Sequence, residues 1–269
     1  MSQAIDPATL RDAAVAFATE AGSILKEGYG KIHAPERKGR IDLVTEYDKR
    51  SEALLLERIA QRFPGHAVLA EESGAHAGSS VRWLVDPLDG TTNFAHNYPF
   101  FAVSIGVEVE GELVAGAIHD PVRDETFAGA RGHGATLNGD PIRVSTIATV
   151  EESLLVTGFP YDVREHPERH LPAFAAFLSR AQGIRRDGSA ALNLAYLACG
   201  RFDGFWERRL SPWDTAAGTL LVREAGGVVT RLDGSAFTLE GLQILASNGR
   251  IHEEMLETLL SSGAVSRPA

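Results

Sequence analysis

The segment Trp83–Phe94, WLVDPLDGTTNF, places two carboxylates, Asp86 and Asp89, at the end of an apolar run. Two neighbouring acids beside apolar residues are costly to ionise, because like charges repel and burial disfavours the charged form. Either a cation lies between them, or they are ordinary turn and cap residues, for which Asp before Gly and Thr is also common. The rest of the sequence has to distinguish these alternatives.

Acidic residues recur at three places, each just after an expected strand or at the start of an expected helix: Glu71-Glu72, Asp86 with Asp89, and Asp214. Carboxylate oxygens suit a hard cation such as Mg²⁺, and shared carboxylates can hold two such ions about 4 Å apart. Taken singly, each group is more simply a turn, loop or first-turn acid. Three groups in the same setting favour a metal centre.

The residues around the aspartates favour a phosphate as the second ligand. Pro87 is expected to stiffen a short loop, and Gly90 to allow a sharp turn. Thr91-Thr92 would then open a helix whose free N–H groups and positive dipole end face an anion. The Asp-x-x-Asp spacing is one residue longer than the Asp-x-Asp-x-Thr of haloacid-dehalogenase-like phosphatases, so we reject an aspartyl nucleophile.

In the first half of the chain, the elements that must position these residues are two predicted helices and many predicted strands. Apolar periodicity predicts helices from Pro7 to about Tyr29 and from about Glu46 to Arg62, followed by largely antiparallel strands. After about Ser145, strands alternate with helices, which indicates a mixed or parallel sheet with helices on its faces. We therefore expect an α/β layered protein with two halves, 1–145 and 146–269, packed as one continuous unit.

Composition limits the partners. The chain has 269 residues and a formal net charge of −10, which argues against nucleic acid as a partner. The single cysteine, Cys199, excludes an intrachain disulfide and favours a reducing compartment. Neither a signal peptide nor a membrane-spanning apolar run is evident, so we expect a cytoplasmic protein with no membrane partner. His166 and His170 flank Pro167 with no third ligand nearby, so we interpret them as an exposed helix start.

Five motifs, in this order, resemble those of the inositol monophosphatase family, a group of lithium-sensitive, magnesium-dependent phosphatases. They are DLVTEYD (Asp42–Asp48), AEES (Ala70–Ser73), DPLDGTTNF (Asp86–Phe94), GSAALN (Gly188–Asn193) and PWDTAAG (Pro212–Gly218). DPLDGTTNF together with PWDTAAG is highly specific. The resemblance implies an alternating α-β-α-β-α sandwich, with a largely antiparallel N-terminal sheet and a mixed C-terminal one.

The resemblance also implies roles for individual residues. Two Mg²⁺ ions, with a weaker third at Glu71, would be held by carboxylates and one carbonyl: Glu71, Asp86, Leu88, Asp89 and Asp214. Thr91 and Asp48 would orient the attacking water, which makes Asp48, Glu71 and Thr91 the catalytic group. The substrate would contact Asp89, Gly90, Thr91, Gly188, Ser189, Ala190, Glu207 and Asp214. Lys38 would approach from a mobile loop.

The substrate is the open point. A myo-inositol monophosphate is the first expectation, because Glu207 stands seven residues before Asp214, as in inositol monophosphatases. Fructose 1,6-bisphosphate, histidinol phosphate and nucleotide phosphates remain alternatives. Arg208 and Arg209 could meet a second anionic group or be surface ion-pair residues. The family also implies a homodimer, and a protein-binding regulator of transcription or RNA processing is the alternative of another class.

Overall fold

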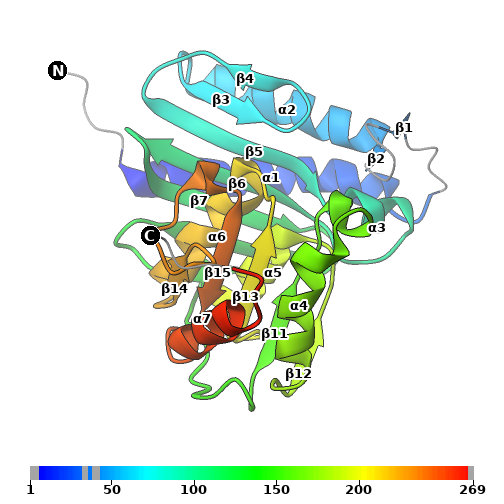
Figure 1. Ribbon diagram of the computed structural model, residues 1–269. Helices are drawn as coiled ribbons and strands as arrows, with labels where there is room; N and C mark the ends of the chain where they lie inside the picture. The colour runs from blue at the N-terminus through cyan, green and yellow to red at the C-terminus, as the bar shows by residue number, and fades with distance from the viewer. Residues whose placement is uncertain (1–5, 32–35, 38–42, 266–269) are drawn as a thin grey trace.

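Two N-terminal helices form the first layer. The computed structural model describes residues 6–31, 36–37 and 43–265, and Figure 1 shows its layers. Helix α1 (Pro7–Gly28) begins at the Asp6 cap, whose carboxylate accepts a hydrogen bond from the Ala8 amide at 3.3 Å. Helix α2 (Glu46–Arg62) packs beside α1 and begins at the Thr45 cap. Both helices bury one apolar face against the first sheet.

The first sheet has eight strands in the order β10-β9-β8-β7-β6-β5-β3-β4. Neighbouring strands are antiparallel except β3 and β5. The strands are β3 (Ala67–Ala70), β4 (Gly74–His76), β5 (Val81–Asp89), β6 (Ala102–Val109), β7 (Glu112–Asp120), β8 (Glu125–Ala130), β9 (Ala135–Leu137) and β10 (Asp140–Ile142). The short helix α3 (Thr91–Ala95) follows β5, and β1 (Glu36–Arg37) pairs with β2 (Leu43–Val44). Because β3 and β5 are parallel, their C-terminal ends lie at the same end of the sheet.

Helices α5 (Ala190–Ala198) and α6 (Pro212–Glu224) form the middle layer, between the two sheets. Gly106 of β6 lets α6 approach the first sheet closely, because a β-carbon there would lie 2.5 Å from that of Ala216. Gly218 does the same between the helices, where a β-carbon would lie 2.4 Å from Leu194. Small residues at these contacts hold the start of α6, and with it Asp214, close to β5.

The second sheet is mixed and has the order β12-β11-β13-β15-β14. Strand β11 is parallel to both β12 and β13, and β15 is antiparallel to β13 and β14. The strands are β11 (Leu154–Thr157), β12 (Gly183–Arg185), β13 (Gly204–Arg208), β14 (Val228–Thr230) and β15 (Gln243–Ser247). Helices α4 (Pro167–Leu178) and α7 (His252–Ser261) cover its outer face, and the single turns η1 (Tyr161–Arg164) and η2 (Leu239–Gly241) lie in loops (Figure 1).

The layers therefore run helix, sheet, helix, sheet, helix, and the predicted α-β-α-β-α sandwich with an antiparallel first and a mixed second sheet is confirmed. One local expectation was wrong. The strand that contains Asp86 does not end there but continues through a register shift to Asp89. The division of the chain near Ser145 stays a prediction. Within the described residues, no helix combines the length and apolarity needed to cross a bilayer.

Candidate active site

A bulge in β5 positions the first two carboxylates. The pairing with β6 shifts between Asp86 and Asp89, where Pro87 cannot donate a ladder hydrogen bond. The Ser51 hydroxyl of α2 donates to the freed Pro87 carbonyl at 2.8 Å, and the Leu88 amide donates to Asp86 Oδ1 at 3.0 Å. The bulge is thus tied to α2. It turns both carboxylates toward the same cavity instead of to opposite faces of the sheet.

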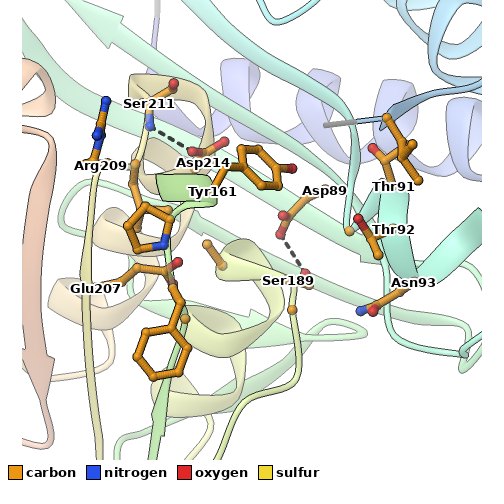
Figure 2. A pocket seen from close by; sticks show the side chains of 18 of the residues that line it. Asp89, Thr91, Thr92, Asn93, Tyr161, Ser189, Glu207, Arg209, Ser211 and Asp214 are labelled. Carbon is orange, nitrogen blue, oxygen red and sulfur yellow. Dashed lines mark hydrogen bonds between the residues drawn. The ribbon is translucent and has the colours of Figure 1, made fainter. Parts of the chain in front are cut away.

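Two further carboxylates line this cavity, Glu71 after β3 and Asp214 in α6, and Figure 2 shows Asp214. Glu71 follows the last residue of β3, and its amide donates to the Val85 carbonyl of β5. Asp214 lies in the first turn of α6, where its Oδ2 accepts a hydrogen bond from the Ser211 amide at 2.7 Å. Asp214 is therefore a first-turn acid, the simpler alternative considered for it, and its carboxylate also lines the cavity.

Asp89 joins the first sheet to the middle layer. Its Oδ2 accepts hydrogen bonds from the Ser189 hydroxyl and the Ala191 amide, both at 2.6 Å. Ser189 is also the N-cap of α5, with its hydroxyl accepting from the Leu192 amide. The predicted substrate-binding segment Gly188–Ala190 is thereby held against the carboxylate group.

The electrostatics of the group call for a cation. Burial raises the pKa of Asp86 well above its ordinary range, and repulsion from Glu71, Asp89 and Asp214 adds to the shift. Burial and the nearby carboxylates likewise raise the pKa of Asp214 far above its usual value. Burial raises the pKa of Asp89 to about 6, although the hydrogen bond from Ser189 opposes this. Asp89 and Asp214 remain partly exposed, but only toward the cavity.

These residues fit a hard metal ion. Their donor atoms are carboxylate oxygens, and no guanidinium or ammonium among the described residues forms an ion pair with Asp86, Asp89 or Asp214. No three Asp, Glu, His or Cys side chains of the described ranges are already arranged as ligands of one ion. Instead the carboxylates repel one another, and after burial the charge of Glu71 is the largest cause of the raised pKa of Asp86. A divalent cation would relieve that repulsion.

Thr91 and Asp48 form a second polar unit beside the carboxylates. The Thr91 hydroxyl donates to Asp48 Oδ1 at 2.9 Å and lies 3.1 Å from the Leu88 carbonyl. Asp48 is fully buried, and Thr45 donates to its other oxygen through the amide at 2.8 Å and the hydroxyl at 2.6 Å. Burial raises the pKa of Asp48. Thr91 lines the cavity whereas Asp48 lies behind it.

Glu207 of β13 lies on the opposite wall of the cavity, which has a volume of about 1280 Å³ (Figure 2). Burial raises the pKa of Glu207 to about 8, the charge of Asp89 contributes, and Arg186 opposes the shift. Gly158 makes room for it, because a β-carbon at that position would lie 2.1 Å from the Glu207 carboxylate. The carboxylate group and Glu207 therefore face one space.

Replacing Gly158 by Ala should displace the Glu207 carboxylate without unfolding the protein. If Glu207 contacts the alcohol part of a phosphate ester, as the resemblance implies, KM for that ester should rise about tenfold with kcat changed less. Steady-state kinetics would measure this. Gly183→Ala is the matched control, since a β-carbon there meets Leu154 only at 3.4 Å. Equal kinetics for both variants would contradict the role of Glu207.

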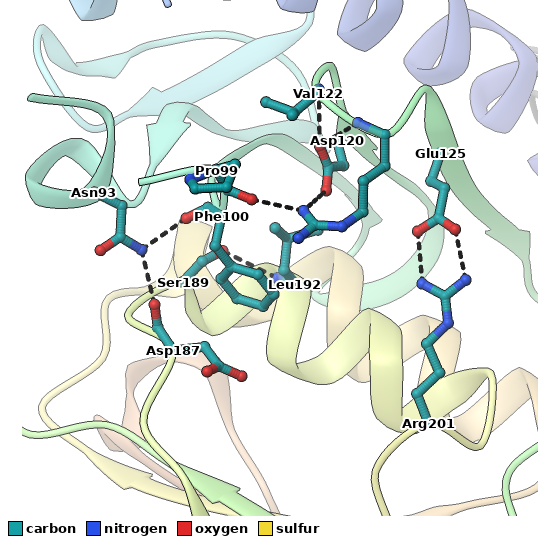
Figure 3. Close-up of polar contacts among 11 residues, drawn as sticks. Asn93, Pro99, Phe100, Asp120, Val122, Glu125, Asp187, Ser189, Leu192 and Arg201 are labelled. Carbon is teal, nitrogen blue, oxygen red and sulfur yellow. Dashed lines mark hydrogen bonds and ion pairs between the residues drawn. The ribbon is translucent and has the colours of Figure 1, made fainter. Parts of the chain in front are cut away.

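Asn93 ties α3 to the segment before α5, as Figure 3 shows. Its side-chain amide donates to the carbonyls of Phe100 at 2.7 Å and Asp187 at 2.8 Å. Close by, the Arg123 guanidinium donates to the Pro99 carbonyl at 2.7 Å and to the buried Asp120 carboxylate at 2.8 Å. These bonds fix the loop after α3, so that Gly90 and Thr91 keep their place beside Asp89.

The structure brings together every predicted site residue that it describes. Glu71, Asp86, Leu88, Asp89, Gly90, Thr91, Gly188, Ser189, Ala190, Glu207 and Asp214 line the cavity, and Asp48 contacts it through Thr91. Lys38 lies outside the described residues. The wall formed by Phe159–Glu165 and the position of Arg186 were not predicted. The one available signal was that this wall begins where the strand expected at Ser153–Phe159 ends, as active-site segments of α/β proteins often do.

The five-layer fold and its cavity of buried carboxylates suit metal-assisted hydrolysis of a phosphate ester. The chain belongs to the inositol monophosphatase family, whose model matches residues 6–264. An inositol-1-monophosphatase of Synechocystis is 48% identical over 245 residues, covering 90% of this chain and 85% of that protein. The Nus factor SuhB of Escherichia coli is 42% identical over 250 residues, covering 91% and 94%. The solved inositol monophosphatase of Anabaena superposes with a TM-score of 0.86 at 45% identity, covering 94% and 96%.

Proposed function

We propose that this protein is a Mg²⁺-dependent phosphatase that hydrolyses the phosphate monoester of a small polyol, with myo-inositol monophosphate as the first candidate. The supporting observation is that four carboxylates from β3, β5 and α6 face Glu207 across one cavity. The relative from Synechocystis is named for the same activity. The alternatives of fructose 1,6-bisphosphate, histidinol phosphate and nucleotide phosphates differ in the alcohol part, which would contact Glu207 and the Gly188–Ala190 segment.

Two or three Mg²⁺ ions would be held by Glu71, Asp86, Asp89 and Asp214, with the Leu88 carbonyl as a further oxygen ligand. Bound Mg²⁺ neutralises phosphate charge and lowers the pKa of water, so that hydroxide is available near neutral pH. The protein would supply the positions of these charges, and we expect no covalent phosphoenzyme, because water is the proposed nucleophile.

Thr91 and Asp48 would orient the attacking water and accept its proton. A hydroxyl carries one hydrogen, and the Thr91 hydroxyl uses it to bond Asp48 at 2.9 Å. Its lone pairs are then free to accept a hydrogen bond from water. Asp48, already engaged by Thr45, would orient Thr91 and take the proton through it. The Gly90 and Thr91 amides would hold phosphate oxygens.

Glu207 would select the alcohol. Above pH 8, where Glu207 is ionised, Glu207→Gln should lower kcat/KM for inositol 1-phosphate about tenfold, because a carboxylate accepts hydroxyl hydrogen bonds more strongly than an amide does. p-Nitrophenyl phosphate, which has no hydroxyls, should be affected less. Phosphate release with both esters measures the difference, and Glu253→Gln on the exposed face of α7 is the control. Equal losses for both esters would contradict the role of Glu207 in selecting a polyol.

The proposed function itself is tested by phosphate release from the candidate esters, with Mg²⁺ and with chelator. Release that depends on Mg²⁺ supports it, and the relative kcat/KM values identify the alcohol. Absence of release from every ester, with folded protein and Mg²⁺ present, would refute it. A homodimer and a cytoplasmic location remain predictions.

A protein-binding role is the second candidate, because a relative that is 42% identical is named as a Nus factor. The outer face of α4 exposes two large apolar side chains, Leu171 and Leu178, which are 48% and 60% exposed. Seven residues apart on a helix, they lie on one face. A pull-down with Nus factors that survives Asp89→Asn but fails in Leu171→Ser/Leu178→Ser would favour this role. Binding that the double variant leaves unaffected would show that α4 does not form the binding surface.

A further inference from the structure

A side pocket opens next to the active-site cavity, between the outer helix α4 and the region where β13 ends and β15 begins. Its volume is about 250 Å³. It is lined by side chains from η1, α4, β13 and the turn before β15, namely Asp162, Arg169, His170, Arg208, Arg209, Gly241, Leu242 and Gln243. Asp162, Arg208 and Arg209 also line the active-site cavity. The two spaces therefore share a wall.

Arg208 is a half-buried cation without a carboxylate partner in the described part of the chain. Its guanidinium donates one hydrogen bond, to the Ala264 carbonyl. Burial lowers the pKa of Arg208, as expected for a charge that lacks a counterion. The remaining donors of a guanidinium are arranged as a planar fork that matches a carboxylate or a phosphate.

His170 provides a second nitrogen donor in this pocket. The sequence suggested an exposed helix start, but the residue is only 8% exposed, because it packs under η1 on the inner face of α4. Its Nε2 lies 3.4 Å from Asp162 Oδ1, which makes an ion pair when His170 is protonated, but the two atoms do not form a hydrogen bond. An acceptor that enters the pocket would complete the hydrogen bonding of Nε2.

The backbone conformation explains why Arg208 and Arg209, adjacent in sequence, both line this pocket. Adjacent residues of a strand normally point to opposite faces. Arg209 takes the left-handed conformation with φ 60°, and so does Leu242 with φ 54°. The Arg209 amide donates to the Leu242 carbonyl. Left-handed backbone at bulky residues is unfavourable and often marks functional sites. Here it ends the alternation and lets Arg208 and Arg209 line the same pocket.

The balance of charge in the pocket is positive. Asp162 forms an ion pair with Arg209 and is the one carboxylate among the residues that line it. Arg169 is 63% exposed and has Glu168 at 3.8 Å. Arg208 has no such neutralisation, and its charge contributes to lowering the pKa of His170, an effect led by burial. The charge of the pocket is therefore opposite in sign to that of the carboxylate group across the shared wall.

We propose that this side pocket binds a phosphate-class oxyanion, with Arg208 and His170 as its main ligands. A pocket below the roughly 300–1,000 Å³ of whole small-molecule sites suits one anionic group. Because it adjoins the active-site cavity, the anion is either the second phosphate of a substrate bound there, which rests on the proposed function, or a free oxyanion. Both have the same chemistry, and the test distinguishes them.

The first experiment measures binding of an anion to the pocket, independently of catalysis. Sulfate is titrated by calorimetry into the full chain with divalent metal removed by chelator. Wild type should bind sulfate, Arg208→Met should bind at least about tenfold more weakly, and Arg208→Lys should recover part of the affinity. Arg185→Met is the matched control, since Arg185 also donates to one carbonyl but lies outside both pockets. Equal sulfate affinity in wild type and Arg208→Met, or no binding to wild type, overturns the proposal. If Arg208→Met does not fold, His170→Asn replaces it with the same expectation.

The second experiment identifies the source of the anion. kcat/KM is measured with Mg²⁺ for fructose 1,6-bisphosphate and for fructose 1-phosphate, which lacks the distal group. A substrate-borne anion predicts that Arg208→Met lowers the ratio of the two values about tenfold. An unchanged ratio together with lost sulfate binding assigns the pocket to a free oxyanion. If wild type hydrolyses neither ester nor any other monoester, the proposed function fails. The sulfate titration still shows whether the side pocket binds an oxyanion.

Discussion

Asp86→Asn is expected to lower kcat/KM by at least about 10³-fold, because it removes charge that would hold both metal ions at the reacting phosphate. The same change should leave the metal-free protein as stable as wild type or more stable at pH 7 to 8. Burial raises the pKa of Asp86 and repulsion from Glu71, Asp89 and Asp214 adds to it, so its negative charge disfavours the folded state. Activity and stability should therefore change in opposite directions.

Phosphate release and thermal unfolding, each with Mg²⁺ and with chelator, measure the two effects. Mg²⁺ should raise Tm of wild type but not of Asp86→Asn, since a ligand stabilises only the state that binds it. Asp140→Asn is the control, because Asp140 is exposed and lies outside the cavity. An Asp86→Asn protein that keeps a tenth of the activity, or the full Mg²⁺ shift in Tm, would show that Asp86 does not hold the metal.

Much of this site could be predicted because its parts are local in the sequence. Asp48 follows a cap residue, Asp214 stands three residues after Ser211, and the segment Asp86–Phe94 contains two ligands and the following turn. Such short-range patterns are determined by the chain itself, through caps, turns and strand ends. The predicted α2, Glu46–Arg62, has the bounds found in the structure for the same reason.

The features that escaped prediction depend on contacts between distant segments. The bulge in β5 exists because α2 satisfies the Pro87 carbonyl through Ser51, 36 residues away. The hydrogen bond between Ser189 and Asp89 joins residues 100 positions apart. The side pocket arises where the left-handed backbone of Arg209 meets Leu242. Burial of His170 likewise follows from the packing of η1 and could not be derived from its neighbours in sequence.

The stabilisation by Mg²⁺ should grow as the pH is raised from about 5 to 8. In the folded, metal-free protein the pKa of Asp89 is raised to about 6 and those of Asp86 and Asp214 further, above their values in the unfolded chain. The folded state then binds more protons than the unfolded state from about pH 4 upward, so its free energy of unfolding falls as the pH rises through this window. Metal ions bind the deprotonated carboxylates, so bound metal offsets the fall in the free energy of unfolding at high pH.

Thermal unfolding across that pH range, with Mg²⁺ and with chelator at matched ionic strength, tests this dependence. The Mg²⁺-induced rise in Tm should be several degrees larger at pH 8 than at pH 5, because about 1 kcal/mol corresponds to roughly 2–4 °C in a domain of this size. Asp89→Asn should reduce the pH dependence, since it removes one titrating carboxylate from the group. An equal Mg²⁺ shift at both pH values would mean that the buried carboxylates are not the metal ligands. The metal would then have to bind at groups that are already ionised at pH 5, such as exposed acids, and the excess of buried negative charge in the cavity would need a different counterion.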